Sequence, residues 1–300
     1  MITEQATMTH PIPRTSDIGE LNKIAAQVRR DVLRMTYLAK SGHPGGSLGA
    51  ADFLVALHFA IMDINPPNFN MDGIGEDIFI LSNGHICPAW YSILARLGYF
   101  PLEELATFRK IHSRLQGHPA TLEGLPGVRI ATGSLGQGFS VAIGAALAKR
   151  LNNDPHKVFV LMGDGEIQEG QIWEGAAFAA HHKVDNLIAA VDWNNQQIDG
   201  PVEKVMSVGD LPMRFKALNW HVILVNDANN MVEVLEALRE AVNASGKGKP
   251  VVLLLRTHMG YPVDFMLDNH KWHGVPPNKE QLEEALKQIP ETFGDFPIIK

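Results

Sequence analysis

The chain has 300 residues, which allows one large domain or two small ones, and its hydrophobic content of 45% is that of an ordinary globular protein with a sizeable core. Its formal net charge of −7, without any basic run, argues against nucleic acid and anionic membranes as main partners. A single cysteine, Cys87, excludes an internal disulfide, and there is neither an apolar run of about 18 residues nor a signal-peptide pattern, so we expect a cytoplasmic protein with no membrane segment.

The first half of the chain alternates apolar helical patterns with loops. Residues 1–16 are polar and contain proline, which predicts a loose, flexible arm. The helix that follows has either Ser16 or Asp17 as its N-cap. The elements predicted for this half are a helix over 17–40, a helix over 47–62, a strand over 77–81, a helix from about Pro88 and a short helix that opens at Pro101.

The second half alternates apolar strands with helices. Its predicted elements are a helix over 138–150, strands over 158–162 and 187–191 with a helix between them, a strand over 220–225, a helix over 231–242, a strand over 251–256 and a last helix over 280–288. This alternation predicts an α/β fold with a doubly wound, mostly parallel sheet and helices on both faces. No linker divides the chain, so we expect residues 17–300 to form a single domain.

The stretch 158–200 is the most informative part of the chain, because it reads as a strand–helix–strand unit. Asp164 follows the first strand and Asn194 follows the second. Neighbouring parallel strands end side by side about 4.8 Å apart, so the two side-chain oxygens can converge at the sheet edge where such folds bind ligands. One charged and one neutral oxygen donor suit Mg²⁺ or Ca²⁺ better than zinc. The residues therefore predict a Mg²⁺-bridged phosphate site.

The amino-acid sequence of this stretch resembles that of a known family. Gly163-Asp164-Gly165 followed by an asparagine pair is similar to the thiamine diphosphate motif, and GDGEIQEGQIWEG…NNQQIDG is similar to the transketolase family in particular. The resemblance implies a thiamine diphosphate-binding fold with Gly163, Asp164 and Gly165 at the cofactor. It also implies that Asp164 and Asn194 are side-chain ligands of Mg²⁺ (or Ca²⁺) and that Gln196 supplies its backbone carbonyl. Taken alone, the GDG turn is equally typical of a plain glycine turn after a strand.

Four histidines lie in loops rich in glycine and proline, in the segments SGHPG, SNGH, QGHP and KWHGVPP. Any one of them is explained as an exposed loop histidine, and no HExxH pattern or short ligand spacing points to zinc. As a set they resemble transketolase, which implies that His43 and His273 face the reacting ketose and the thiazolium. His118 would then face the substrate hydroxyls, and His85 would contact the cofactor diphosphate near the substrate. His258 departs from the family pattern and receives no role.

A glycine-rich loop, TGSLGQG over 132–138, precedes a predicted helix. Glycines at a helix start let backbone N–H groups approach an anion, although close packing at the helix entry explains them as well. The loop is neither a Walker A loop nor a GxGxxG fingerprint, because no Lys-Ser/Thr pair follows and no acidic partner is placed for a ribose. By resemblance to the family's TGPLGQG, Gly133, Ser134 and Leu135 would contact the aminopyrimidine end of the cofactor, with Ser134 in place of the usual proline.

Two acidic residues, Glu169 and Glu174, belong to the predicted helix of the central unit. Acidic side chains near a helix N-terminus are favoured by the helix dipole, which explains them without any function. In transketolases, matching glutamates form a buried acidic network that links two active sites across a dimer. The resemblance implies that Glu169 and Glu174 pass or share protons between sites and do not attack the substrate.

The matches to transketolase run from about residue 20 to 278 and correspond only to the N-terminal, diphosphate-binding half of that family. They imply the N-terminal subunit of a split transketolase, which transfers a two-carbon ketol unit from a ketose phosphate to an aldose phosphate via thiamine diphosphate and Mg²⁺. A C-terminal, pyrimidine-binding subunit would complete it in a two-to-two heterotetramer. The alternatives are a subunit of another thiamine diphosphate enzyme, of the deoxyxylulose-phosphate synthase or 2-oxo acid dehydrogenase type, and a non-catalytic nucleotide-binding homologue.

Overall fold

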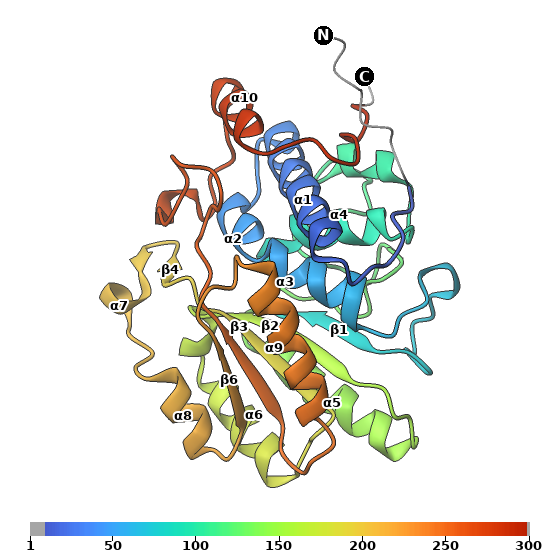
Figure 1. The fold of residues 1–300 in the computed structure, drawn as a ribbon, viewed down its shortest axis with the longest axis vertical. Coiled ribbons are helices and arrows are strands. Elements are labelled where there is room, and N and C mark those ends of the chain that lie inside the picture. The colour runs from blue at the N-terminus through green and yellow to red at the C-terminus, as the bar shows by residue number, and fades with distance from the viewer. Residues whose placement is uncertain (1–9, 299–300) are drawn as a thin grey trace.

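The computed structural model describes residues 10–298, and its centre is a five-stranded sheet (Figure 1). The strand order is β1-β2-β3-β7-β6, and every neighbouring pair is parallel. The strands span Ile78–Leu81 (β1), Val158–Gly163 (β2), Leu187–Asp192 (β3), His221–Val225 (β6) and Val251–Leu255 (β7), and a separate antiparallel pair is formed by Gln196–Gln197 (β4) and Gly200–Pro201 (β5). The predicted doubly wound α/β fold is confirmed.

The inner strands are buried on both faces, which is why they read as continuous apolar runs in the sequence. Successive side chains of a strand point to opposite faces of the sheet. On β2, Phe159 and Leu161 join the core on one side, while Val158, Val160 and Met162 join the core on the other. The sheet therefore separates two hydrophobic cores.

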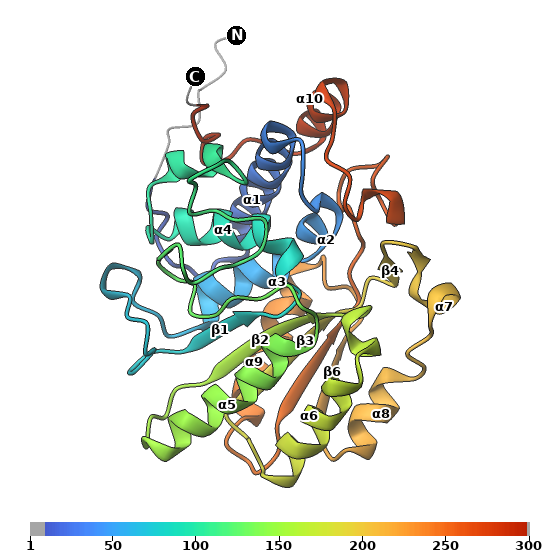
Figure 2. The same ribbon diagram turned by 180° about the vertical axis from the view of Figure 1, so that it is seen from behind.

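Helices cover both faces of the sheet (Figures 1 and 2), with α1, α3, α4 and α9 over one core and α5, α6 and α8 over the other. The α-helices span Ile18–Ala39 (α1), Pro44–Gly49 (α2), Ala51–Ala56 (α3), Cys87–Arg96 (α4), Gln137–Leu151 (α5), Gly170–His181 (α6), Val202–Val205 (α7), Leu211–Ala217 (α8), Met231–Ala244 (α9) and Lys279–Gln288 (α10). The sequence did not predict α7 and α8, because helices this short carry little periodic signal. In the described chain, no helix combines the length and the apolar character that crossing a membrane requires.

The long first helix, α1, begins where the sequence predicts. The side chain of Asp17 accepts a hydrogen bond from the backbone N–H of Glu20 at 2.9 Å, which makes Asp17 the N-cap. Further along, Asp31 of α1 and Arg96 of α4 form a fully buried ion pair, with Nε–Oδ2 and Nη2–Oδ1 distances of 2.6 and 2.9 Å. This pair fixes the two helices against each other and was not visible in the apolar pattern.

The helix predicted over 47–62 is wrong in its bounds. α2 begins at Pro44, where a proline fits the first helical turn, and the chain breaks before α3. A π-helical turn over Leu57–Ile61 then closes the segment. In that turn, Nδ1 of His58 bonds to the carbonyl oxygen of Leu54 at 2.8 Å and so competes with the regular helix hydrogen bonds.

The N-terminal residues that the structure describes, 10–16, pack against the core. Ile12 is buried, and its backbone N–H donates to the carbonyl of Arg96 at 2.8 Å. The backbone N–H of Thr15 donates to a carbonyl of the π-helical turn at 3.1 Å. The expectation of a loose arm is therefore wrong for residues 10–16, because the buried side chain of Ile12 attaches this otherwise polar stretch to the core. Residues 1–9 of the expected arm lie outside the described residues.

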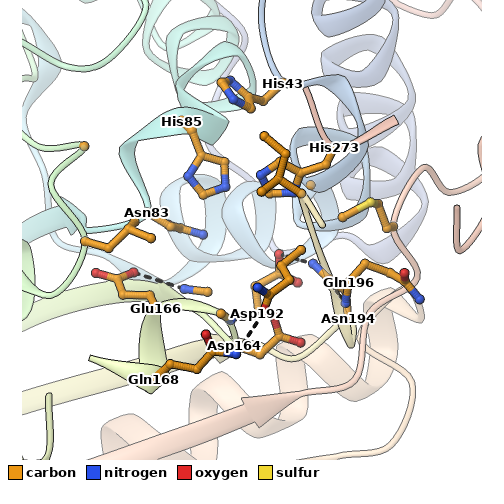
Figure 3. Close-up of a pocket in the computed structure, with 18 of the residues that line it drawn as sticks. His43, Asn83, His85, Asp164, Glu166, Gln168, Asp192, Asn194, Gln196 and His273 are labelled. Atoms are coloured by element: carbon orange, nitrogen blue, oxygen red, sulfur yellow. Dashed lines mark hydrogen bonds between the residues drawn. The ribbon is translucent and has the colours of Figure 1, made fainter. Parts of the chain in front are cut away.

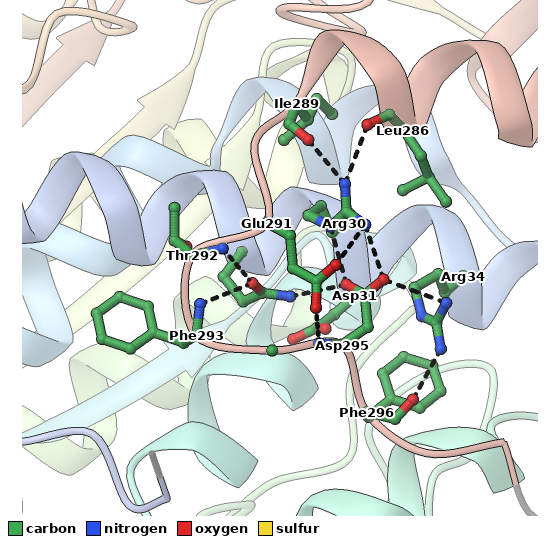
Figure 4. Close-up of polar contacts among 12 residues, drawn as sticks. Arg30, Asp31, Arg34, Leu286, Ile289, Glu291, Thr292, Phe293, Asp295 and Phe296 are labelled. Carbon is green, nitrogen blue, oxygen red and sulfur yellow. Dashed lines mark hydrogen bonds and ion pairs between the residues drawn. The ribbon is translucent and has the colours of Figure 1, made fainter. Parts of the chain in front are cut away.

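The segment after α10 crosses α1 and is held to it by a polar network (Figure 4). Asp295 accepts hydrogen bonds from Nε and Nη2 of Arg30, both at 2.8 Å, and from Gln27 at 3.0 Å. Arg34 lies 3.3 Å from the same carboxylate and 4.8 Å from the ring centroid of the buried Phe296. Burial alone would raise the pKa of Asp295, but the bond from Arg30 and the charges of both arginines outweigh burial, so this pKa is lowered.

We expect Asp295→Asn to lower the free energy of unfolding by about 2–4 kcal/mol near pH 7, because it removes the partner of two largely buried arginines. The lowered pKa means that this stability is present above about pH 4 and is lost as the pH falls through the folded-state pKa. The gap between wild type and variant should therefore narrow in acid, as measured by urea unfolding across this range. Glu291→Gln is the control, since Glu291 is half-exposed and 3.5 Å from Arg30 and should cost less than about 0.5 kcal/mol. Equal costs for the two variants would contradict this account.

Candidate active site

A cavity of about 350 Å³ opens at the carboxyl ends of β1, β2 and β3 (Figure 3). It brings together twelve of the predicted residues, namely His43, His85, His118, Gly133, Leu135, Gly163, Asp164, Gly165, Glu169, Asn194, Gln196 and His273. Ser134 and Glu174 do not line it. Asn83, Glu166 and Asp192 line it as well and were missed by the sequence analysis. Loops far apart in the sequence thus meet in one place.

The position of Asp164 follows from the pairing of β2 with β3. These parallel neighbours pair Gly163 with Asp192, and the backbone N–H of Asp164 donates to the carbonyl of Asp192 at 3.1 Å. The Asp164 carboxylate accepts two backbone hydrogen bonds, one of them from Asn195 at 2.5 Å. The loop that carries Asn194 is therefore bonded directly to Asp164, as the strand–helix–strand pattern predicts.

The amide of Asn194 is held in one orientation. Its Oδ1 accepts from the backbone N–H of Gln196 at 2.8 Å, and its Nδ2 donates to Oδ2 of Asp192 at 2.9 Å. The other carboxylate oxygen of the buried Asp192 accepts from the hydroxyl of Thr257. An ionised carboxylate can only accept, so Asp192 determines which end of the amide faces the loop of Gln196. Sequence reasoning missed Asp192, because an acidic residue that ends an apolar strand looks like the start of an exposed loop.

The oxygen donors at this edge fit a divalent cation. Asp164 and Asp192 are each 2% exposed, and no ion pair reaches either carboxylate within residues 10–298. Burial and the charge of Asp192 raise the pKa of Asp164, and burial raises the pKa of Asp192 to about 6. Two buried carboxylates without a cation are unfavourable, and a cation would stabilise them.

The donor set indicates which cation this would be. No cluster of three His, Cys, Asp or Glu side chains able to hold a metal occurs among the described residues, so a site here depends on amide and carbonyl oxygens as well. Asp164, Asn194 and Gln196 all line this part of the cavity and offer carboxylate, amide and backbone oxygens. Oxygen ligands of this kind are preferred by Mg²⁺ and Ca²⁺.

The four loop histidines form one cluster in the cavity, and Figure 3 shows three of them, His43, His85 and His273, on the side away from Asp164 and Asn194. The ring centroid of His43 lies 5.2 Å from that of His85, 5.5 Å from that of His273 and 6.1 Å from that of His118. Burial and then the charges of neighbouring groups lower the pKa of His43 to about 4, and the same causes lower the pKa of His85. Burial also lowers the pKa values of His118 and His273, so the cluster is neutral near pH 7.

Several buried polar atoms in the cavity have no hydrogen-bond partner within residues 10–298. They are Nδ1 of His43, Nδ1 of His273, Oδ1 of Asn83 and Oε1 of Gln196. By contrast, both ring nitrogens of His58, which lies in the core, are bonded. Buried polar groups are normally satisfied, so unsatisfied atoms that line one cavity mark it as a place where a ligand binds.

The glycine-rich loop at 132–138 forms one wall of the cavity by close packing. Gly133 has a φ of +133°, and a Cβ there would lie 2.7 Å from the ring of His118. The loop therefore brings Gly133 and Leu135 to the cavity, while Ser134 is exposed outside it. The structure does not bring the side chain of Ser134 into the site.

The two helix glutamates are both exposed in this chain. Glu169 is the N-cap residue of α6 and makes no side-chain cap bond, and Glu174 lies on the outer surface of the same helix. A buried acidic network is therefore not present within the described chain. The surface around them is partly apolar, since Phe178 of α6 is 46% exposed and Val141 of α5 is 44% exposed.

Comparisons with known proteins give one consistent result. A family model described as "Transketolase, thiamine diphosphate binding domain" matches residues 21–294. The apulose-4-phosphate transketolase subunit of Phocaeicola vulgatus is 37% identical over 265 residues, which cover 88% of this chain and 92% of that protein. The 6-deoxy-6-sulfo-D-fructose transketolase subunit SqwG of Clostridium sp. (strain MSTE9) is 39% identical over 249 residues, which cover 83% of this chain and 88% of that protein.

Solved structures agree with the sequence relatives. The crystal structure of transketolase from Campylobacter jejuni matches with a TM-score of 0.85 and 33% sequence identity. The match covers 94% of this chain and 45% of that chain. This chain thus spans less than half the length of the solved transketolase but most of the length of the two separate subunits.

We expect Asp192→Asn to weaken Mg²⁺-dependent binding of thiamine diphosphate by about 10–100-fold. An amide at position 192 donates as well as accepts, so it no longer fixes the orientation of the Asn194 amide. Calorimetric titration of the cofactor into the protein, as isolated from its own cells, measures the effect. The control is Asp72→Asn, which makes the same chemical change in an exposed turn. The prediction fails if the two variants bind the cofactor equally well.

Proposed function

The chain belongs to the transketolase family of thiamine diphosphate enzymes, and we propose that it is the N-terminal subunit of a two-subunit transketolase. In this proposal it transfers a two-carbon ketol unit from a ketose phosphate to an aldose phosphate, as in the pentose phosphate pathway, and is active only with a C-terminal subunit. The observation that carries the proposal is a single cavity that joins an oxygen-donor edge to a cluster of neutral histidines. A cytoplasmic location fits the single, buried Cys87.

The proposed cofactor site lies at the ends of β2 and β3. Asp164 and Asn194 would hold Mg²⁺ through their side chains and Gln196 through its backbone carbonyl, and the metal would bind the diphosphate. Gly163 and Gly165 flank the metal ligand and leave room for the backbone to approach the cofactor. When bound, thiamine diphosphate supplies the nucleophilic carbon that carries the ketol unit.

The proposed roles of the histidines follow from their neutral state. A neutral imidazole can accept a proton at one ring nitrogen while it donates from the other. His43 and His273 each have an unpartnered Nδ1 and would bond to the reacting ketose and the cofactor. His118 would bond to the substrate hydroxyls, and His85 would contact the diphosphate and the substrate. The lowered pKa values keep these imidazoles unprotonated near pH 7, so each can accept a proton without first releasing one.

The cavity also supports the need for a second subunit. None of the described residues that line it is Lys or Arg, so the described part of the cavity wall has neither side chain to bind the phosphate end of a sugar. The two relatives are named as subunits, one for apulose 4-phosphate and one for 6-deoxy-6-sulfo-D-fructose. Both names describe sugars with an anionic group, and we extend to this chain only a sugar phosphate. Basic side chains of a partner would bind that phosphate.

We further propose that the active assembly is a two-to-two heterotetramer in which this chain also contacts a second copy of itself. The exposed apolar side chains on α5 and α6 support it, because such surfaces mark interfaces. Burial at that interface would bring Glu169 and Glu174 into the acidic network that the family resemblance implies. Their role is to share protons between sites.

Native mass spectrometry tests this assembly on the protein isolated from its own cells with thiamine diphosphate and Mg²⁺ kept present. We expect two copies of this chain, two copies of a partner and two cofactors, because each cofactor would lie between a diphosphate-binding and a pyrimidine-binding subunit. A homodimer with neither partner nor cofactor would overturn the proposal.

Substitution of one histidine tests the chemistry. We expect His43→Asn to lower kcat/KM for ketol transfer by about 10²–10⁴-fold, the usual contribution of a group that moves a proton. The assay is steady-state turnover of the complex with its partner. The control is His112→Asn, because His112 is an exposed loop residue with a φ of +65°, which asparagine tolerates. Equal activity of the two variants would rule out a role for His43.

A further inference from the structure

Glu166 is a buried carboxylate in the wall of the cavity, and the proposed function gives it no role. It lies in a short 3₁₀ turn, Glu166–Gln168, directly after the GDG segment, and only 1% of it is exposed. No Lys or Arg within residues 10–298 forms an ion pair with it. Burial of a carboxylate without a neighbouring cation destabilises the folded protein. The hydrogen bonds to Glu166 must therefore offset this destabilisation.

Three donors from three different loops satisfy this carboxylate. Oε1 accepts from the hydroxyl of Ser82 and from the backbone N–H of Gly136 at 2.7 Å, and Oε2 accepts from the backbone N–H of Gly163 at 3.2 Å. The donors come from the loop after β1, the glycine-rich loop before α5 and the end of β2. Hydrogen bonds to an ionised acceptor are stronger than neutral ones, so one side chain ties three loops together.

Each of these loops carries a residue of the proposed cofactor site. Ser82 precedes Asn83 and His85, Gly136 follows Leu135, and Gly163 precedes Asp164. Figure 3 draws Glu166 in the same cavity as Asn83 and Asp164, and a dashed line marks a hydrogen bond of its carboxylate. A shift of any of these loops would move a cofactor contact.

The β1 loop and the glycine-rich loop approach each other so closely that glycines are needed at the contact. A Cβ at Gly138 would lie 2.7 Å from Cα of Ser82, and a Cβ at Gly84 would lie 3.0 Å from the backbone nitrogen of Gly133. Backbone thus meets backbone between the β1 loop and the glycine-rich loop. This close approach leaves no space for a larger side chain, and the Glu166 carboxylate adds polar contacts that join the two loops.

We propose that Glu166 is a positioning residue of the cofactor site, which fixes the β1 loop, the glycine-rich loop and the GDG turn relative to one another. This role rests on the proposed function, since it assigns Glu166 to the same thiamine diphosphate site. All three donors are satisfied only when both terminal atoms of the side chain at position 166 are hydrogen-bond acceptors. A glutamine at this position would leave the N–H of either Gly136 or Gly163 facing an NH₂ group, whichever way its amide turns.

The test compares Glu166→Gln with Glu236→Gln, which makes the same change on the exposed face of α9. Hydrogen exchange of the full chain, followed by mass spectrometry, reports on peptides that cover 131–138 and 160–165. We expect exchange in at least one of these peptides to be about tenfold faster or more in Glu166→Gln only, because one backbone hydrogen bond is lost. Thiamine diphosphate affinity of the complex with its partner, at saturating Mg²⁺, should fall by about tenfold or more.

A second variant separates positioning from loss of folding. Ser82→Ala removes one donor but leaves both backbone bonds to Glu166, so we expect it to fold and to weaken the cofactor affinity by a smaller factor than Glu166→Gln. Unchanged exchange and unchanged affinity in Glu166→Gln would overturn the role of Glu166. If the wild-type complex itself fails to bind thiamine diphosphate, the proposed function falls and the positioning of a cofactor falls with it.

Discussion

The candidate site depends on the pairing of two parallel strands, β2 and β3, which places two buried carboxylates side by side. Asp164 and Asp192 are joined through a backbone hydrogen bond, and within residues 10–298 neither has a basic partner. Backbone N–H groups, a hydroxyl and an amide hold these carboxylates in place. Such an arrangement is unfavourable until a proton or a cation completes it, so it is better explained by binding than by stability.

The opposite wall of the cavity has a complementary property. The ring centroids of His43, His85 and His273 lie 5.0, 5.2 and 5.5 Å apart, and burial makes the protonated forms of these side chains unfavourable. The two walls therefore differ in chemistry, with hard oxygen donors on one side and neutral imidazoles on the other. A ligand that has a cation-bound anionic group at one end and exchanges protons at the other matches both walls at once. This pairing of properties is why we assign the cavity to a diphosphate cofactor and a hydroxylated substrate.

Local chemical patterns predicted much of the fold and of the site. Apolar runs located all strands of the main sheet, and GDG and the Gly/Pro-rich loops located Asp164 and the histidines. Tertiary contacts decided what the sequence did not reveal. Asp192 and Glu166 look like solvent-exposed acids after a strand, and only the packing of neighbouring loops shows that they are buried and what they bond to. Likewise, the helix expected over 47–62 is divided at Ala50 and becomes π-helical over Leu57–Ile61, where His58 bonds to the backbone, and the apolar periodicity shows neither change.

Three further features of the chain have a common physical explanation. The cavity has no basic side chain among its described lining residues, Glu169 and Glu174 face outward, and α5 and α6 expose apolar side chains beside them. The exposed apolar part of this surface is costly for an isolated protein, because its side chains stay in contact with water. Contact with other polypeptides would bury these apolar side chains, and basic groups of those polypeptides would supply cations at the open side of the cavity. The same physical argument that assigns a cofactor to the site therefore also favours a site that is shared between chains.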